Sequence, residues 1–229
     1  MSRLILIDNW LESLGGHNYQ YAVEILNAAR DSGLEVALAT AKSFEKSAGS
    51  ISREWSCYPV FPYAWNRTHT IGVDGKRKVP IDVDGFPLPQ GRDSNGPLAR
   101  KWNRWFRPLK VWDRRRRIRA FANACKTLFG HIGFDSEDLI FLPSVSDFDF
   151  LGLVDFLRSY TETQKLHWHV QFHYDIFDGR PPDFERQENR RICMQRQFSA
   201  ALSTLKNHRL TFYATTPLIA DQYNRLGVG

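Results

Sequence analysis

The sequence predicts an α/β protein whose mainly parallel sheet of six to seven strands is Rossmann-like and doubly wound, with helices on both faces. Three observations carry this prediction. Short apolar runs alternate with segments of helical periodicity through most of the 229 residues. The connections between the apolar runs are long enough for parallel crossovers. Leu4–Ile7 is an uninterrupted apolar run, as expected of a strand that is buried on both faces.

The N-terminal residues predict a βαβ unit. After the strand Leu4–Ile7 comes a polar turn that ends in Gly15-Gly16-His17. Apolar residues then recur at helical spacing as far as Ala29, and Ser32-Gly33 supplies a stop signal. Glu35–Thr40 is predicted to be the second strand.

The middle of the chain is less regular. Lys42–Arg53 predicts a short helix with a loop, and Cys57–Pro62 a third strand, which its two prolines confine to a short or edge position. Residues 65–100 are rich in Gly and Pro and have no sustained helical period. We expect them to form an irregular insertion, either a small hairpin or a mobile loop.

The C-terminal half returns to alternating helices and strands. Asp147 is expected to cap the helix Phe148–Tyr160, and Asp183 the helix that runs to about Asn207. The predicted elements are a helix within Arg100–Gly130, a strand Asp138–Val145, a helix Phe148–Tyr160, a strand Leu166–Tyr174, a helix to about Asn207, a strand Arg209–Thr215 and a helix from Thr216-Pro217 to Leu226.

Composition narrows the class of protein. No apolar run approaches the ~20 residues that span a bilayer, and only four aliphatic residues follow Arg3, so no signal peptide is expected. The three cysteines, Cys57, Cys125 and Cys193, are far apart and form no CxxC pair. They are typical of reduced thiols in a cytoplasmic protein, and no metal site is expected from them.

The positive charge is local. The net charge is +6, but Arg100–Arg119 carries ten Lys or Arg residues against one acid, which leaves 21 basic and 24 acidic residues elsewhere. Tryptophans interleave with these cations, and one interpretation is docking on an anionic membrane surface. Stacking on single-stranded nucleic acid or on a polyanionic glycan is a second interpretation, and a solvated helix face with inward tryptophans a third. The acidic remainder disfavours nucleic acid.

Ligands of doubly wound sheets bind beyond the carboxyl ends of the strands, so residues at those ends are candidates. Gly15 and Gly16 stand where a helix begins, and their backbone could cradle a phosphate or a sugar. The alternative is a tight turn that needs glycine for its geometry. His17 could either cap the helix or contact a ligand, and the sequence does not favour one of these roles. The strand-end carboxylates Asp8, Glu12, Asp147, Asp149 and Asp175 could bind hydroxyls or act as a base.

His173 is the other candidate. It stands at the end of a predicted buried strand, where a neutral imidazole could hydrogen-bond or stabilise charge at a reacting centre. The alternative is a solvent-facing strand histidine, because His167, His169 and His173 share a face at period 2. Zinc binding by the three is disfavoured since they would spread over ~20 Å. We treat His167 and His169 as structural.

Three segments together resemble the N-terminal domain of GT-B glycosyltransferases, in the retaining, family-4-like branch (glycosyl transferase group 1). They are the first strand with its GGH turn, the late strand ending in His173-Tyr174-Asp175, and the closing ATTPLIADQYNRLGVG. The resemblance covers most of the chain apart from 65–119. It implies two facing Rossmann-like domains, of which the N-terminal one mainly receives the acceptor and the other binds the nucleotide sugar.

The resemblance also implies residue roles and partners. His173 would contact the donor sugar as the catalytic histidine, and Gly15, Gly16, His17 and Asp175 would bind substrate. The donor is a substrate, so no cofactor is expected. Residues 1–229 would form a single domain, and its partners would be the missing C-terminal GT-B domain and a glycan or lipid acceptor. We therefore expect a truncated half of a hexosyltransferase-like enzyme, inactive alone and cytoplasmic or peripheral at the inner membrane surface.

A stand-alone Rossmann-like nucleotide-binding module is the alternative. The first turn lacks GxGxxG, and the second strand ends in Ala39-Thr40 without the acidic residue that binds a ribose, which argues against it.

Overall fold

The computed structural model describes residues 2–46, 55–62, 70–73, 77–80, 97–133, 135–176, 185 and 188–228, with the backbone alone for 45–46, 70–73, 77–80, 97–114 and 190. Six strands form one all-parallel sheet in the order β3-β2-β1-β6-β7-β8. This confirms the predicted fold class. The strands are β1 (Arg3–Asp8), β2 (Glu35–Ala41), β3 (Ser56–Phe61), β6 (Leu139–Val145), β7 (His167–Phe172) and β8 (Arg209–Ala214).

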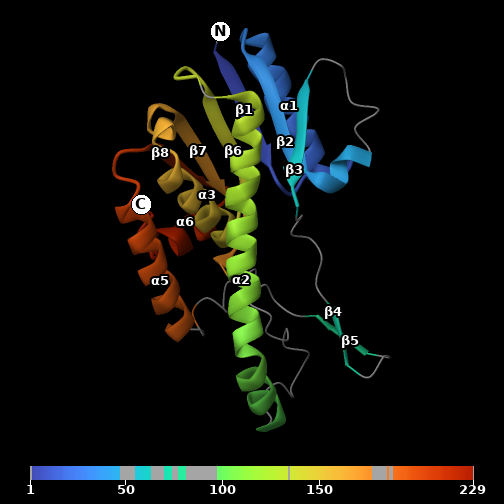
Figure 1. The fold of residues 1–229 in the computed structure, drawn as a ribbon, viewed down its shortest axis with the longest axis vertical. Coiled ribbons are helices and arrows are strands. Elements are labelled where there is room, and N and C mark those ends of the chain that lie inside the picture. The colour runs from blue at the N-terminus through green and yellow to red at the C-terminus, as the bar shows by residue number, and fades with distance from the viewer. Residues whose placement is uncertain are drawn as a thin grey trace.

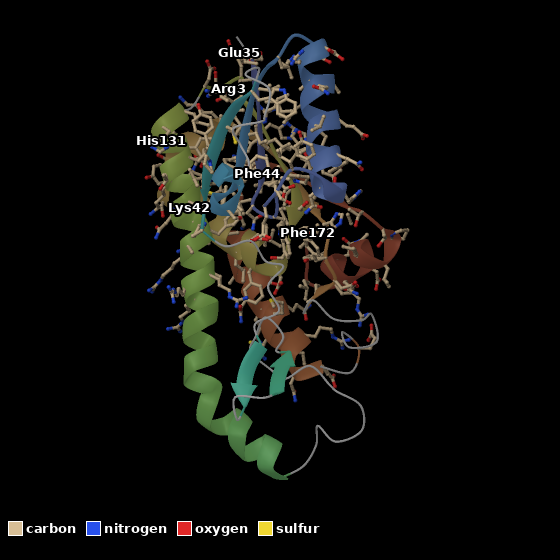
Figure 2. The ribbon with its side chains drawn as sticks, turned by 90° about the vertical axis from the view of Figure 1, so that its right-hand side faces the viewer. Arg3, Glu35, Lys42, Phe44, His131 and Phe172 are labelled. Carbon is tan, nitrogen blue, oxygen red and sulfur yellow. The ribbon has the colours of Figure 1, made fainter. Side chains whose placement is uncertain are left out.

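Helices cover both faces of the sheet. In Figure 1, α2 (Pro97–Ile132), α3 (Asp147–Ser159) and α5 (Glu188–Ser203) lie in front of the strands, and α1 (Gly16–Asp31) lies behind them. Figure 2 shows the same layers from the side, with the strands between α2 and α1. Each layer has its own core: Leu6, Leu26 and Leu38 pack beneath α1, whereas Phe150, Trp168 and Phe198 belong to the larger core on the other face.

The predicted N-terminal βαβ unit is confirmed. All of β1 after Arg3 is buried, and it pairs in parallel with β2 from Arg3↔Glu35 to Asp8↔Thr40. Gly15 (φ 107°) and Gly16 (φ 77°) turn the chain into α1 with backbone conformations that side chains rarely adopt. Figure 2 labels Arg3 and Glu35 at the amino ends of the strands and Phe172, the last residue of β7, at the opposite end.

The long helix α2 begins at Pro97, earlier than the predicted start, and its C-terminal part packs on the sheet. Phe121, Cys125 and Leu128 are buried in the larger core. α2 crosses α3 closely at Gly152, where an added Cβ would lie 2.7 Å from the Cβ of Phe121. Towards its N-terminus, α2 continues past the carboxyl ends of the strands (Figure 1).

The structure corrects one of the predicted helix caps. Asp147 was expected to cap α3, but the N-cap is Ser146, whose hydroxyl accepts from the Asp149 amide while the Asp149 carboxylate accepts from the Ser146 amide. Asp147 occupies the first turn instead, where its negative charge interacts favourably with the positive end of the helix dipole. The Thr216 cap of α6 (Pro217–Asn224) is confirmed, with the Thr216 hydroxyl accepting from the Ile219 amide.

The remaining predictions are confirmed in part. Strands β4 (Thr70–Val73) and β5 (Arg77–Pro80) pair as an antiparallel hairpin within the expected insertion. Short 3-10 helices follow β2 (η1, Lys42–Lys46) and α3 (η3, Thr161–Lys165). Helix α5 ends at Ser203, before the predicted Asn207, since turns take the chain into β8. The Asp183 cap lies outside the described residues.

Candidate functional site

The candidate site lies where the strand order reverses. β1 is followed along the chain by β2 on one side of it, whereas its other neighbour β6 leads on to β7 and β8. Ligands of doubly wound sheets bind at the carboxyl ends of the strands near such a reversal. Here Asp8, Asn9 and Trp10 close β1, and Ser146 to Asp149 follow β6.

A buried hydrogen-bond network joins these two strand ends. The Asp149 carboxylate accepts from Asn9 Nδ2 at 3.0 Å, from Trp10 Nε1 at 3.4 Å and from the Ser146 hydroxyl at 2.8 Å. Burial raises the pKa of Asp149 against the opposing effect of these donors. Since Asp149 is buried, its role is to position Asn9 and Trp10 and not to contact a ligand directly.

Asp8 is a second buried carboxyl group in the same place. Its side chain is 0% exposed; Oδ1 accepts from the Trp10 amide at 3.0 Å, and Oδ2 has no hydrogen-bond partner among the described residues. Burial raises its pKa to about 7, and the neighbouring Asp149 charge adds to the increase. The buried position of Asp8 therefore lowers the stability of the folded protein when the carboxyl group is ionised.

Two histidines lie close together at the carboxyl edge of the sheet. His17, in the first turn of α1, and His173, directly after β7, have ring centroids 6.2 Å apart. Gly15 is the N-cap of α1 and makes no side-chain cap, so His17 does not cap the helix; it is exposed beside the glycine turn. The structure thus brings together Gly15, Gly16, His17 and His173.

His173 is suited to act as a neutral imidazole. Burial lowers its pKa, and the nearby His17 lowers it further. Its Nδ1 is buried without a hydrogen-bond partner in the part of the chain that the structure describes, and its amide donates to the Val145 carbonyl at 3.3 Å. Because Nδ1 is shielded from solvent, a ligand would meet the exposed part of the half-buried imidazole and not this atom.

Aromatic rings form one wall of the site. The Tyr174 ring stacks on Trp10 with centroids 4.2 Å apart and meets His173 edge-on at 5.0 Å. The Tyr174 carbonyl accepts from the Tyr223 hydroxyl of α6 at 3.3 Å. These contacts hold the half-buried Tyr174 in place next to His173, so its ring is a preorganised surface.

Asp175 is tied to α6. Its carboxylate accepts from Gln222 Nε2 at 2.8 Å, and Gln222 Oε1 accepts from the Ile176 amide at 2.8 Å. This bridge fixes the loop after β7. Asp175 remains half-buried, so a ligand can reach the side chain only beside this hydrogen bond.

Sequence reasoning missed three residues of the site: Asn9, Trp10 and Tyr174. They directly follow a predicted strand or a candidate histidine, and polar or aromatic residues in that position were the available signal. Which of them point into the site depends on contacts between residues about 140 positions apart.

Fold and site together define a Rossmann-like parallel α/β protein with a candidate site at the switch point of its sheet. No protein-family model, curated protein or solved structure matches the chain. None of the described helices has both the length and the apolar character to cross a membrane.

Proposed function

We propose that this chain is the acceptor-side Rossmann-like half of a glycosyltransferase that moves a sugar from a nucleotide sugar to a glycan or lipid. The observation that supports it is the meeting of His17 and His173 beside the Gly15-Gly16 turn, at the carboxyl edge of the sheet. In the resemblance drawn from the sequence, a glycine turn and a strand-end histidine face the donor across a cleft.

The proposed chemistry assigns each group a role. In glycosyl transfer the acceptor oxygen forms a bond to the anomeric carbon while the bond to the nucleoside diphosphate breaks, and the proton of the acceptor hydroxyl passes to the departing diphosphate. Neutral His173 would hydrogen-bond the transferring sugar, and the backbone amides at the start of α1 favour the departing phosphate. Tyr174, stacked on Trp10, would present an aromatic face to a sugar ring.

Nuclear magnetic resonance of the histidine rings tests this proposal. Millimolar UDP-glucose and GDP-mannose are added to the chain, with UDP, GDP and NAD as comparisons. The sugar-bearing nucleotides should shift the His17 and His173 ring signals, and His173→Ala should weaken their binding. His131→Ala is the matched control because it is exposed near the amino ends of the strands (Figure 2).

The same titration distinguishes the proposed transferase half from the alternative, a stand-alone nucleotide-binding module. Tight binding of NAD with the same ring shifts would identify a nucleotide-binding module in place of a transferase half. If no nucleotide sugar moves either ring signal at millimolar concentration, the direct contact of His17 and His173 with the donor, on which the glycosyltransferase proposal rests, is refuted and the proposal fails with it.

We further propose that the basic run docks this half on an anionic membrane. At about 100° per residue, the aromatic and aliphatic positions in the first half of α2 centre ~180° away from those of its core-facing half. The first set is Leu98, Trp102, Trp105, Phe106, Leu109, Val111 and Trp112; the second is Ile118, Phe121, Ala122, Cys125, Leu128 and Phe129. An apolar stripe of sequence positions that does not continue the core-facing set and is flanked by cations suits a lipid interface.

Vesicle sedimentation tests the membrane proposal. Binding should require phosphatidylglycerol in phosphatidylcholine vesicles and weaken with salt. Arg115→Glu should reduce it, whereas Lys206→Glu, another exposed basic position, should reduce it less. Equal binding to neutral vesicles, or salt-dependent retention on DNA without vesicle binding, would overturn it.

A further inference from the structure

Strand β7 departs from what a buried parallel strand should be. Strands covered on both faces are near-continuous apolar runs, as β1 is. β7 instead alternates: Trp168, Val170 and Phe172 are buried in the larger core, while His167, His169 and Gln171 on the opposite face are half-buried. Its neighbour β8 does the same with Thr211 and the exposed Tyr213.

This polar face lies on the side of the sheet that carries α1. That helix contacts β1 and β2. The described helices α2, α3 and α5 pack on the opposite face (Figure 1). Tyr213 is accordingly 45% exposed. We call the face made by His167, His169, Gln171, Thr211 and Tyr213 the β7–β8 face.

Its side chains form three hydrogen-bonded pairs in succession, which we call the ladder, and the first pair lies beside the candidate site. Tyr21 of α1, which contacts His17, donates its hydroxyl hydrogen to Gln171 Oε1 at 3.2 Å. One step further, His169 Nδ1 and the Tyr213 hydroxyl are 2.9 Å apart. The ladder ends where His167 Nε2 and the Thr211 hydroxyl lie 2.9 Å apart. From His173 to His167 it follows the strand for ~20 Å.

We propose that the β7–β8 face binds a neutral oligosaccharide, whose end reaches His173. The occupant is inferred from the chemistry of the face. Histidine, glutamine, threonine and tyrosine offer uncharged donors and acceptors that match sugar hydroxyls. Tyr213 adds an exposed aromatic ring, which stacks at 5.9 Å on His169 and suits the apolar side of a pyranose.

Charge and continuity argue against other occupants. Charge is confined to one end of the face: no Asp, Glu, Lys or Arg belongs to the ladder from Tyr21 to Thr211, and the exposed Arg209, which pairs in register with His167, stands beyond its far end. The part around Gln171 and Tyr213 therefore favours an uncharged ligand over a polyanion or a basic peptide. The face is also continuous with the His17–His173 pair through Tyr21 and Gln171. The inference rests on the proposed function for calling the oligosaccharide an acceptor, whereas the binding itself can be tested without it.

Amide spectra of the whole chain, titrated with neutral hexasaccharides of glucose, mannose and galactose, test the inference. Glucose alone and a heparin hexasaccharide are the comparisons. We expect a neutral hexasaccharide to shift the signals of His169, Gln171 and Tyr213 at millimolar concentration, more than glucose does. Tyr213→Ala should weaken binding by roughly two- to tenfold. Leu218→Ala is the matched control, since Leu218 is 47% exposed on α6.

Each outcome of this titration either supports or overturns the inference. Absence of shifts on the β7–β8 face, shifts with the heparin fragment alone, or equal affinity of the wild type and Tyr213→Ala overturns the inference. The proposed function fails separately, when nucleotide sugars leave the His17 and His173 signals unmoved. Oligosaccharide binding that survives such a failure identifies a carbohydrate-binding protein.

Discussion

Replacement of Asp8 by Asn should stabilise the protein at pH 8 and do so much less at pH 5. Asp8 is fully buried, and its folded-state pKa is raised from 3.8 to about 7. Between these two values the unfolded chain ionises while the folded chain holds its proton. Stability therefore falls as the pH rises through this window and becomes level above pH 7.

The size of the effect follows from the same values. From pH 5 to pH 7 the folded state holds one proton more than the unfolded state at this position, which costs about 3 kcal/mol at 1.36 kcal/mol per pH unit. The asparagine variant does not titrate and keeps an oxygen to accept from the Trp10 amide. Its stability relative to the wild type should thus rise by about 3 kcal/mol between pH 5 and pH 8.

Urea unfolding at pH 5, 6, 7 and 8 measures this difference. Asp155→Asn, which removes an exposed carboxyl group from α3, controls for a change in net charge. If the difference between wild type and Asp8→Asn is the same at all four pH values, Asp8 is ionised throughout in the folded protein and the reasoning fails. A stability cost confirmed at neutral pH is what functional sites commonly carry.

Three further predictions concern the fold around the site, and urea unfolding checks each of them. Gly152→Ala should destabilise by about 1–3 kcal/mol, because its Cβ would meet that of Phe121 at 2.7 Å; Gly130→Ala in α2, with open space around it, should instead stabilise by ~0.5–1 kcal/mol. Ser146→Ala should cost about 1 kcal/mol through loss of the α3 cap, and an unchanged stability would contradict the capping geometry. Gly15→Ala should cost roughly 1–3 kcal/mol at φ 107° and also lower the affinity for UDP-glucose; a variant as stable as the wild type would show that the turn relaxes.

The fold could be predicted because its signals are local. The apolar run of β1 and the helical spacing of α1 each follow from a few neighbouring residues. The α3 cap was misassigned because Ser146 and Asp147 are both good N-cap residues, and the choice depends on Asp149 reaching back to the Ser146 amide. The end of α5 was misplaced for a related reason, since the residues after Ser203 continue in turns.

The site could be located but not assembled from the sequence. Carboxyl ends of parallel strands share one edge, which was enough to select Gly15, Gly16, His17, His173 and Asp175 as candidates. The pairing of His17 with His173 depends on how α1 sits over the sheet, and that of Asn9 with Asp149 on a register that local patterns do not reveal.

Two features that are unusual for a doubly wound sheet occur in the same part of the molecule. A fully buried carboxyl group closes β1, and one of its oxygens has no hydrogen-bond partner within the described ranges of the chain; polar residues replace aliphatic ones along one face of β7. Each is unfavourable for a doubly wound sheet whose only requirement is stability, because such sheets are stabilised by burying apolar side chains on both faces. Local choices that oppose the fold are expected where function requires them. His173 directly follows β7, whose polar residues belong to the β7–β8 face, and it stands at the same carboxyl edge of the sheet as Asp8. Under the proposed function it is the residue that would meet the bound sugar.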